Sequence, residues 1–373
     1  MKKPRFAMER WQSEWEHHVR FNLGESGVHP LRLDELVPAE ERDALFGTEL
    51  AYLQTDGTSE LKQIIAGLYP GAAPNNVLVT TGSIEANFQV LWHLLEPGDR
   101  ILFMRPNFLQ MQGLAESFGA HSVPFYLKEP DWALDLDEVS GLCSEGVKLI
   151  VVTDPNNPAG SLLSLEQRRG LEELAARAGA WLVVDEVYLG AELDGNTLPS
   201  WWGAYPKTIV TCGLSKAYGL PGLRVGWIVA PPEIVQSCWA GKDYTSISIS
   251  ALSERLAVRA LQPEKRAALL ERTRNIIRPN WEIFATWMED LDGMLSCVPT
   301  RAGAVAFPRY HLDINSSRMA QRLKEERSVL ICPGDHFGLD GFFRIGLGNP
   351  AAEFSQALGK VAAGLRLIRD QGA

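Results

Sequence analysis

Four polar segments directly follow short apolar stretches of the chain, and each carries side chains that can do chemistry. Lys216 offers an amine that can act as a nucleophile or a base, and Asp185 and Tyr188 offer a carboxylate and a phenol. The segments are Thr81-Gly82-Ser83, Asp154 to Pro158, Asp185 to Tyr188, and Ser215-Lys216. Ligands of an open α/β sheet bind outside the carboxyl ends of its strands. The sequence therefore predicts one site assembled from distant segments.

The apolar stretches before these segments predict the strands of one sheet. They are short and nearly all apolar, which is typical of strands buried on both faces of a mostly parallel sheet. They are residues 77–80, 100–103, 149–152, 181–184 and 208–210. Helical stretches such as residues 165–178 alternate with them and form a βαβ series. We expect an α/β domain with a mostly parallel sheet covered by helices.

The pattern changes after about residue 250. Residues 264–290 predict a long helix, and residues 304–307, 329–331 and 342–345 predict strands of a smaller α/β domain. We expect an N-terminal arm and small-domain segment at 1–40, a large domain at 41–260 and a small C-terminal domain at 261–373.

The first twenty residues place Trp11 and Trp15 at helical spacing among charged residues. They predict a short amphipathic helix, which either packs on the protein's own core or covers the site or a partner subunit.

Composition excludes several classes of partner. The chain has 373 residues, 46% of them hydrophobic, which is typical of a globular protein with a large core. A formal net charge of -10 disfavours nucleic acid, and no stretch approaches the ~20 apolar residues that a membrane helix needs. The five cysteines have no metal-type spacing, and no signal peptide is recognisable. We expect a cytoplasmic protein without a metal, a nucleic acid or a membrane as partner.

One segment carries a specific resemblance. Lys216 and Arg224 stand in the run from Ser215 to Gly226 with seven residues between them, and Asp185-x2-Tyr188 and Asn157-Pro158 precede this run. The combination resembles the class I and II aminotransferases, which are fold-type I pyridoxal-phosphate enzymes. Matching motifs extend from about Gly27 to Arg344. The resemblance implies pyridoxal 5'-phosphate as cofactor, an α-amino acid as substrate, and a large sheet domain joined to a smaller α/β domain.

The resemblance assigns the central residues to the cofactor ring. Lys216 would form the Schiff base with the cofactor aldehyde and then move protons as a base. Asp185 would keep the pyridine nitrogen protonated, and Tyr188 and Asn157 would donate hydrogen bonds to the phenolate oxygen. The structural alternatives are a helix cap for Asp185 and a turn residue for Asn157.

The phosphate needs donors and positive charge. Ser83 and Ile84 open a predicted helix, and their amides would hold the phosphate at its N-terminus. Ser215 and Arg224 would add a hydroxyl and a fixed cation. Tyr52 resembles the tyrosine that reaches the phosphate from the other subunit, which implies a homodimer with a shared active site. The alternative for Tyr52 is a packed aromatic.

Further matches concern the ring face and the substrate. Phe108 matches the aromatic residue that stacks on the cofactor ring, although it could equally belong to the core. Arg344 matches the arginine that binds the substrate α-carboxylate with two parallel hydrogen bonds. Gly27 and Val28 resemble the loop whose backbone contacts the same carboxylate. His29 could be a substrate contact, a second acid-base group or a structural histidine.

Two positions depart from the family pattern. Gly213 stands where a Ser or Thr often binds phosphate, and Ala159 replaces the usual Thr after Asn157-Pro158. Neither change removes a catalytic group, so the phosphate would be held by other donors or slightly less tightly.

A narrower resemblance is to the capreomycidine synthases, which cyclise a hydroxylated arginine by elimination and internal guanidine addition. It rests on residues 26–29, 216–227, 243–244 and 306–309. A guanidinium requires acidic partners, and the candidates are Glu9, Glu25, Asp56 and Asp243, although such residues are commonly solvated or capping. Three functions remain open: first an aminotransferase, then a cyclase or eliminase of this kind, and last a non-catalytic cofactor-binding module.

Overall fold

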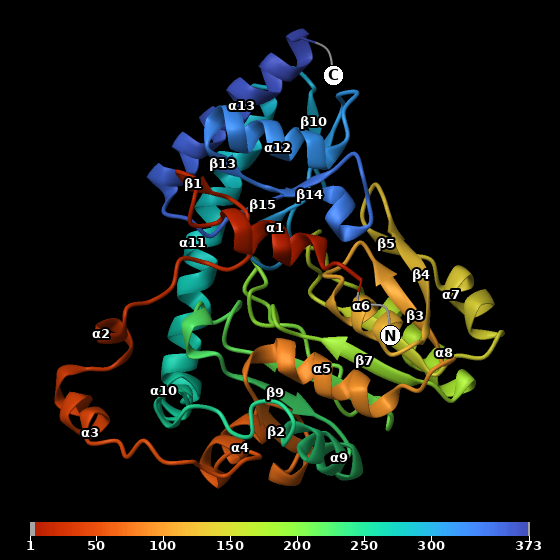
Figure 1. Ribbon diagram of the computed structural model, residues 1–373, viewed down its shortest axis with the longest axis vertical. Coiled ribbons are helices and arrows are strands. Elements are labelled where there is room, and N and C mark those ends of the chain that lie inside the picture. The colour runs from red at the N-terminus through yellow and green to blue at the C-terminus, as the bar shows by residue number, and fades with distance from the viewer. Residues whose placement is uncertain (1–3, 372–373) are drawn as a thin grey trace.

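A sheet of eight strands forms the centre of the molecule in the computed structural model, which describes residues 4–371 (Figure 1). The spatial order of the strands is β2-β9-β8-β7-β6-β3-β4-β5. Their bounds are β2 Val77–Thr80, β3 Arg100–Arg105, β4 His121–Lys128, β5 Ala133–Leu134, β6 Leu149–Thr153, β7 Trp181–Asp185, β8 Thr208–Gly213 and β9 Gly226–Val229. Five neighbouring strands run parallel, namely β4, β3, β6, β7 and β8. Strands β5 and β9 pair antiparallel with their neighbours. The predicted mostly parallel sheet is confirmed.

Successive side chains of the central strands enter two different cores, because the side chains of a strand alternate between the faces of its sheet. Val152 and Val184 belong to the larger apolar cluster, while Val151 and Val183 belong to a second cluster on the opposite face. Every residue of β6 and β8 is buried. This burial on both faces explains why the strands are apolar throughout and why polar side chains appear only where the strands end.

Helices cover both faces of the sheet. They are α4 Ser59–Ala66, α5 Gly82–Leu94, α6 Gln110–Ser117, α7 Leu136–Cys143, α8 Leu165–Ala178, α9 Pro232–Lys242 and α10 Ala251–Leu261, with 3-10 turns at Pro74–Asn76 and Pro221–Leu223. The predicted helix at 165–178 is confirmed as α8. Ser164 caps its first turn by accepting from the amide of Gln167, and Gly179, with φ of 65°, ends it in the left-handed conformation.

A second group of elements follows the sheet. Its helices are α11 Pro263–Glu289, α12 Ser316–Arg327 and α13 Ala351–Gln371, with a 3-10 turn at Gly334–Phe337. Its short strands are β10 Leu295–Ser296, β11 Val305–Ala306, β12 Arg309–Tyr310, β13 Val329–Leu330, β14 Cys332–Pro333 and β15 Phe343–Gly346. The strand predicted at 304–307 is shorter than expected, since Pro308 lacks the amide hydrogen that would extend its ladder.

The N-terminal residues join this second group. Strand β1 (Phe21–Asn22) pairs in parallel with β13, and α1 (Ala7–Trp15) lies across the carboxyl ends of the large sheet (Figure 1). The segment with α2 (Leu33–Leu36), a 3-10 turn at Ala39–Glu41 and α3 (Arg42–Phe46) then projects to one side of the molecule. The domain boundaries at residues 40 and 260 stay a prediction. Among residues 4–371, no helix has the length and apolar character needed to span a membrane.

Candidate active site

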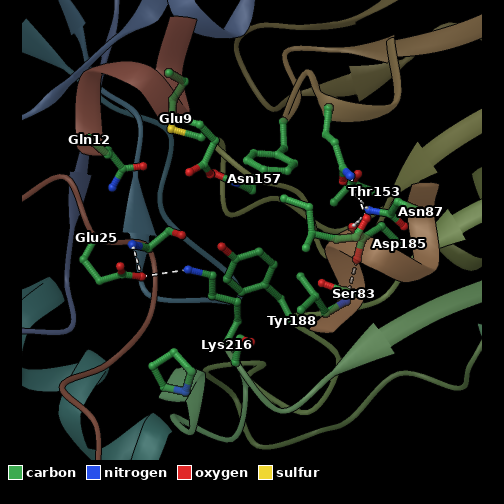
Figure 2. Close-up of a pocket in the computed structure, with 18 of the residues that line it drawn as sticks. Glu9, Gln12, Glu25, Ser83, Asn87, Thr153, Asn157, Asp185, Tyr188 and Lys216 are labelled. Atoms are coloured by element: carbon green, nitrogen blue, oxygen red, sulfur yellow. Dashed lines mark hydrogen bonds and ion pairs between the residues drawn. The ribbon is translucent and has the colours of Figure 1, made fainter. Parts of the chain in front are cut away.

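A pocket of about 280 Å³ lies at the carboxyl ends of β6, β7 and β8, beneath α1 (Figure 2). Nine of the ten residues predicted to hold the cofactor line it: Ser83, Ile84, Phe108, Asn157, Asp185, Tyr188, Ser215, Lys216 and Arg224. Strand register explains this convergence, because Asp185 at the end of β7 lies opposite Thr153 on β6 and Thr211 on β8.

The carboxylate of Asp185 is held in place by two donors. Asn87 Nδ2 donates to Oδ2 over 3.2 Å, and the backbone amide of Val187 donates to Oδ1 over 3.0 Å. Thr211 donates in turn to Asn87 Oδ1 over 2.6 Å. Burial raises the pKa of Asp185 to about 6, against the lowering effect of these hydrogen bonds. A buried carboxylate in this state favours a cationic partner, and a pyridinium nitrogen is one.

Asn87 is a functional candidate that sequence reasoning missed. It lies on α5, one turn beyond the phosphate-binding segment, and only 1% of its surface is exposed. The available signal was a polar residue in a helix whose neighbouring positions, such as Ala86 and Val90, are apolar and buried. A buried amide must find hydrogen-bond partners, and Asn87 finds Asp185 and Thr211.

Lys216 and Tyr188 face each other in the middle of the pocket (Figure 2). The Tyr188 side chain is buried, and its hydroxyl has no hydrogen-bond partner within the described part of the chain. Burial raises the pKa of Tyr188, while the charges of Lys216 and Arg344 lower it. An unsatisfied buried phenol beside an amine fits the phenolate oxygen of pyridoxal phosphate as its acceptor.

Arg344 is 1% exposed and reaches the site from β15. Its Nη1 donates to Asn157 Oδ1 over 2.9 Å, and its Nη2 donates to the carbonyl of Gly24. The Nε atom is buried and has no partner among residues 4–371. Because Oδ1 of Asn157 accepts from Arg344, Nδ2 is the atom of that amide left to donate into the pocket.

Glycines shape the predicted phosphate site at the N-terminus of α5. Gly82 has φ of 75°, and a Cβ there would lie 2.5 Å from Nη2 of Arg224. Arg224 is itself left-handed, with φ of 51°, and its Nη1 donates to Ser215 Oγ over 3.2 Å. The guanidinium therefore lies directly over the first turn of α5, where amides and positive charge together favour an anion such as a phosphate.

The structure also explains the family departure at Gly213. A Cβ at this position would lie 2.9 Å from the carbonyl oxygen of Val225 and 3.2 Å from Cα of Gly226. No side chain fits there, so a hydroxyl donor at 213 is excluded by the closeness of the neighbouring strand. Ser83, Ser215 and Arg224 line the pocket here and are the side chains that could bind a phosphate beside the α5 amides.

Helix α1 packs on the protein's own core and also covers the pocket, as the two alternatives for the N-terminal segment predicted. One side packs on the second group of elements, where Trp11 Nε1 donates to the carbonyl of Ile331 over 2.9 Å and Lys324 lies over the ring of Trp15. The other side brings Glu9, together with Gln12, Ser13 and Glu16, to the pocket. Glu9 makes no ion pair or hydrogen bond with the residues that the structure describes.

None of the four predicted substrate-binding residues belongs to the pocket lining. Val28 is buried in the apolar core around β1. His29 is exposed and its Nδ1 lies 3.0 Å from the carbonyl of Gly348, so it is neither a pocket residue nor a buried structural histidine. Arg344 is too deeply buried to line the pocket, but it lies directly behind Asn157. Gly27 does adjoin the site, since a Cβ there would lie 3.6 Å from Cδ of Lys216.

The four acidic candidates for a guanidinium partner lie partly inside and partly outside the pocket lining. Glu9 and Glu25 line the pocket, whereas Asp56 pairs with Lys62 and Asp243 follows α9, and neither of these aspartates lines the pocket. Tyr52 is 80% exposed and lies away from the pocket of its own chain. Its role toward a partner subunit stays a prediction.

Comparison with known proteins agrees with this geometry. The family model described as aminotransferase class I and II matches residues 20–361. Capreomycidine synthase from Streptomyces vinaceus is 33% identical over 368 residues, which cover 96% of this chain and 93% of that protein.

Solved structures show the same similarity. A pyridoxal-phosphate-dependent aminotransferase from Streptococcus suis 89-1591 has a TM-score of 0.92 and 30% identity, over 98% of this chain and 99% of that one. The pyridoxal-phosphate-dependent cyclase OrfR has a TM-score of 0.89 and 27% identity, over 100% of this chain and 99% of that one. The family model matches most of the sequence, the fold matches that of a solved family member, and the pocket suits the cofactor. The chain therefore belongs to the class I and II aminotransferase family of pyridoxal-phosphate-dependent enzymes.

Proposed function

We propose that this enzyme removes water from a hydroxylated arginine and closes the guanidine onto the resulting carbon, as the capreomycidine synthase group does. The observation that carries the proposal is Glu9, an unpaired carboxylate that α1 holds in the pocket on the side away from Asp185 (Figure 2). Burial raises the pKa of Glu9, while Lys216 and Arg344 lower it. A partly buried carboxylate without a partner favours a cationic ligand group, and a guanidinium matches its geometry.

The two ends of the pocket suit the two ends of such a substrate. Arg344, which lies directly behind Asn157, and the backbone near Gly27 are the groups that would bind the α-carboxylate of an amino acid in this proposal. Glu9 on α1 and Glu16 directly after it line the pocket and would supply negative charge for the distal end of the side chain. The similarity to capreomycidine synthase over 96% of the chain supports the same assignment.

The residues of the site have separate tasks in this reaction. Bound pyridoxal phosphate withdraws electrons from the substrate Cα and so makes its hydrogen acidic. Lys216 takes that proton on its ε-amine. Asp185 would pair with the ring nitrogen of the bound cofactor, and Tyr188 and Asn157 would donate to its ring oxygen. Ser83, Ser215 and Arg224 would hold its phosphate, and Phe108 is the side chain that would stack on its ring.

Transamination of an α-amino acid is the second candidate. The Streptococcus suis protein described as an aminotransferase has nearly the same fold, with a TM-score of 0.92, and is 30% identical. Lys216, Asp185 and Tyr188 can serve either reaction, because the two differ only in where the proton and the leaving group go.

Product analysis separates the two candidates. The purified holoenzyme is incubated with 3-hydroxyarginine and, in parallel, with arginine and a keto-acid acceptor. We expect a product that has lost one water from hydroxyarginine, and little keto acid from either amino acid. Keto acid as the main product, with no loss of water, would establish transamination instead. Citrulline tests recognition of the cation, since it replaces the guanidinium with a neutral group, and we expect it to bind more weakly than arginine.

We also propose that the active enzyme is a homodimer. The projecting segment and the residues directly after α3 expose Phe46 at 85%, Leu50 at 80% and Tyr52 at 80% of their surfaces. Large apolar side chains gathered on one segment commonly mark an interface with another chain. If a second copy of the chain covered this segment, Tyr52 of the first copy would lie near the phosphate site of the second, as the family resemblance implies.

A further inference from the structure

The side chain of Glu25 is fixed against Lys216. Lys216 Nζ donates to Glu25 Oε1 over 2.7 Å, and the backbone amides of Ser26 and Gly27 donate to the same oxygen, each over 2.8 Å. Glu25 stands in the loop after β1, and that loop is held by the pairing of β1 with β13. The carboxylate is therefore oriented by its own backbone and is not a mobile surface group.

Glu25 lies on a definite side of the amine. Figure 2 shows Lys216 directed toward Glu25, on the side of the pocket that also carries Glu9 and Gln12. Asp185 and Ser83, which would hold the cofactor ring and phosphate, lie on the opposite side. The ion pair thus draws the amine away from the ring end of the pocket and toward the end that would hold the substrate.

Four charged or titratable groups act on Lys216 from four elements. Burial lowers its pKa, while Glu25 in the loop after β1 and Tyr188 after β7 raise it, and Arg344 on β15 lowers it; the net pKa of Lys216 is raised. Glu9 on α1 is the fourth group, and the charge of Lys216 lowers its pKa. In the same pair, Lys216 lowers the pKa of Glu25 to about 2. Glu25 is the group among these that bonds the amine directly.

We propose that Glu25 is a positioning residue that decides where Lys216 delivers the proton it takes from the substrate Cα. Glu25 holds the ammonium on the substrate side, where the leaving hydroxyl at Cβ can receive the proton. The inference rests on the proposed function, because it concerns the choice between elimination and transamination at the same lysine.

The step balances without an oxidant. The Cα–H bond breaks, and the proton passes to the amine of Lys216, which becomes an ammonium. The Cβ–O bond then breaks and its electron pair leaves with the oxygen. The ammonium returns the proton to that oxygen, so that one water departs and the lysine is neutral again. In transamination the same proton would go to a carbon of the cofactor instead of to the leaving oxygen.

The test compares Glu25→Gln with Glu9→Gln. Both variants remove one negative charge from the same pocket, but only Glu25 bonds Lys216. The first readout uses apoprotein: Lys216 is labelled with acetic anhydride at a series of pH values, and labelling is followed by mass spectrometry. We expect half-labelling in Glu25→Gln at a pH lower by about one unit or more, since an ion pair at this distance strongly favours the ammonium. We expect no comparable shift in Glu9→Gln.

The second readout uses holoenzyme and 3-hydroxyarginine. The ratio of keto acid to dehydrated product is expected to rise about tenfold in Glu25→Gln and to stay near the wild-type value in Glu14→Gln, which changes an exposed glutamate of α1. Glu25→Asp keeps the charge and is expected to restore most of the wild-type ratio, which a merely structural role for the side chain would not predict. Thermal melting of each apoprotein checks that the variants fold.

The outcomes separate the inference from the proposed function. An unchanged product ratio in Glu25→Gln, in an enzyme whose wild type removes water, would overturn the inference alone. An unchanged labelling profile would overturn it as well, because the amine would then not depend on Glu25. Keto acid as the main product of the wild type would overturn the proposed function, whatever the labelling profile shows.

Discussion

Nη1 of Arg344 lies 2.9 Å from Oδ1 of Asn157, and this hydrogen bond joins β15 in the second group of elements to the segment that follows β6 in the large sheet. Both side chains are buried. One contact therefore links the residue expected to bind the substrate α-carboxylate to the residue expected to bind the cofactor ring. A ligand that binds to one of these two side chains therefore affects the orientation of the other side chain.

Arg344→Lys is expected to lower kcat/KM by roughly 10- to 100-fold, mainly through a higher KM. Lysine cannot keep the bond to Asn157 and also present two parallel donors to a carboxylate, and hydrogen bonds to charged groups contribute about 1.5–3 kcal/mol each. Steady-state kinetics would check this. Arg318→Lys, on the exposed surface of α12, is the matched control and should behave as wild type. An unchanged KM in Arg344→Lys would remove Arg344 from substrate binding.

Lys216→Ala is expected to abolish covalent attachment of the cofactor and to reduce turnover to background, because no other amine lines the pocket among residues 4–371. Borohydride reduction followed by peptide mass spectrometry would locate the attachment in the wild type. Lys207→Ala removes an exposed lysine directly before β8 and should retain the label at Lys216. Labelling at another lysine of the wild type would contradict the assignment of Lys216.

Glu9→Gln is expected to weaken the binding of arginine by about tenfold, because a charge-assisted hydrogen bond becomes a neutral one. Binding of norvaline, which has no distal cation, should change little. Spectral titration of the holoenzyme measures both affinities. Glu14→Gln changes an exposed glutamate of the same helix and serves as control. Equal losses for arginine and norvaline would point to a disturbed α1 rather than a lost cation partner.

Tyr52 provides a test of the shared active site. If Tyr52 serves the phosphate of the partner, Tyr52→Phe should weaken cofactor affinity several-fold, since one hydrogen bond to a charged phosphate is lost. Mixing Tyr52→Phe with Lys216→Ala should then form hybrid dimers in which one site has both native residues. Recovery of tight cofactor binding in that site, measured by equilibrium dialysis, is the expected result. A monomer in sedimentation would rule out the shared site.

Glu186 predicts a pH dependence of folding stability. It is fully buried beside Asp185, accepts from Ser200 and from the amide of Trp201, and burial raises its pKa to about 8. The unfolded chain has the ordinary pKa of about 4.3, so the folded state gains a proton between these values and loses stability as the pH rises toward 8.

Glu186→Gln removes this titration. The variant should gain stability relative to the wild type as the pH rises from 5 to 9, because a neutral amide replaces a carboxyl group that must ionise in the core. Urea unfolding of both apoproteins at each pH would measure the difference. A difference that stays constant over this range would show that Glu186 does not titrate there.

The sequence by itself predicted five of the eight strands of the large sheet, the mostly parallel βαβ pattern and most of the residues that line the pocket. Buried parallel strands must be apolar, so Asp185 and the Asn157 segment at their ends were recognisable as polar residues where the apolar run stops. Lys216, Arg224 and Arg344 followed from their spacing and from the family resemblance. These features are local in sequence, and local patterns record them directly.

Only the tertiary structure decided which distant residues meet. Asn87 reaches Asp185, and Glu25 reaches Lys216 across 191 positions of sequence, through contacts that no periodicity encodes. The same folding carries His29 to the surface and separates Asp56 from the acidic group around Glu9. The physical reason is that side-chain proximity across elements depends on sheet register and on the packing of α1 and the β1 loop, and these are set by the whole core.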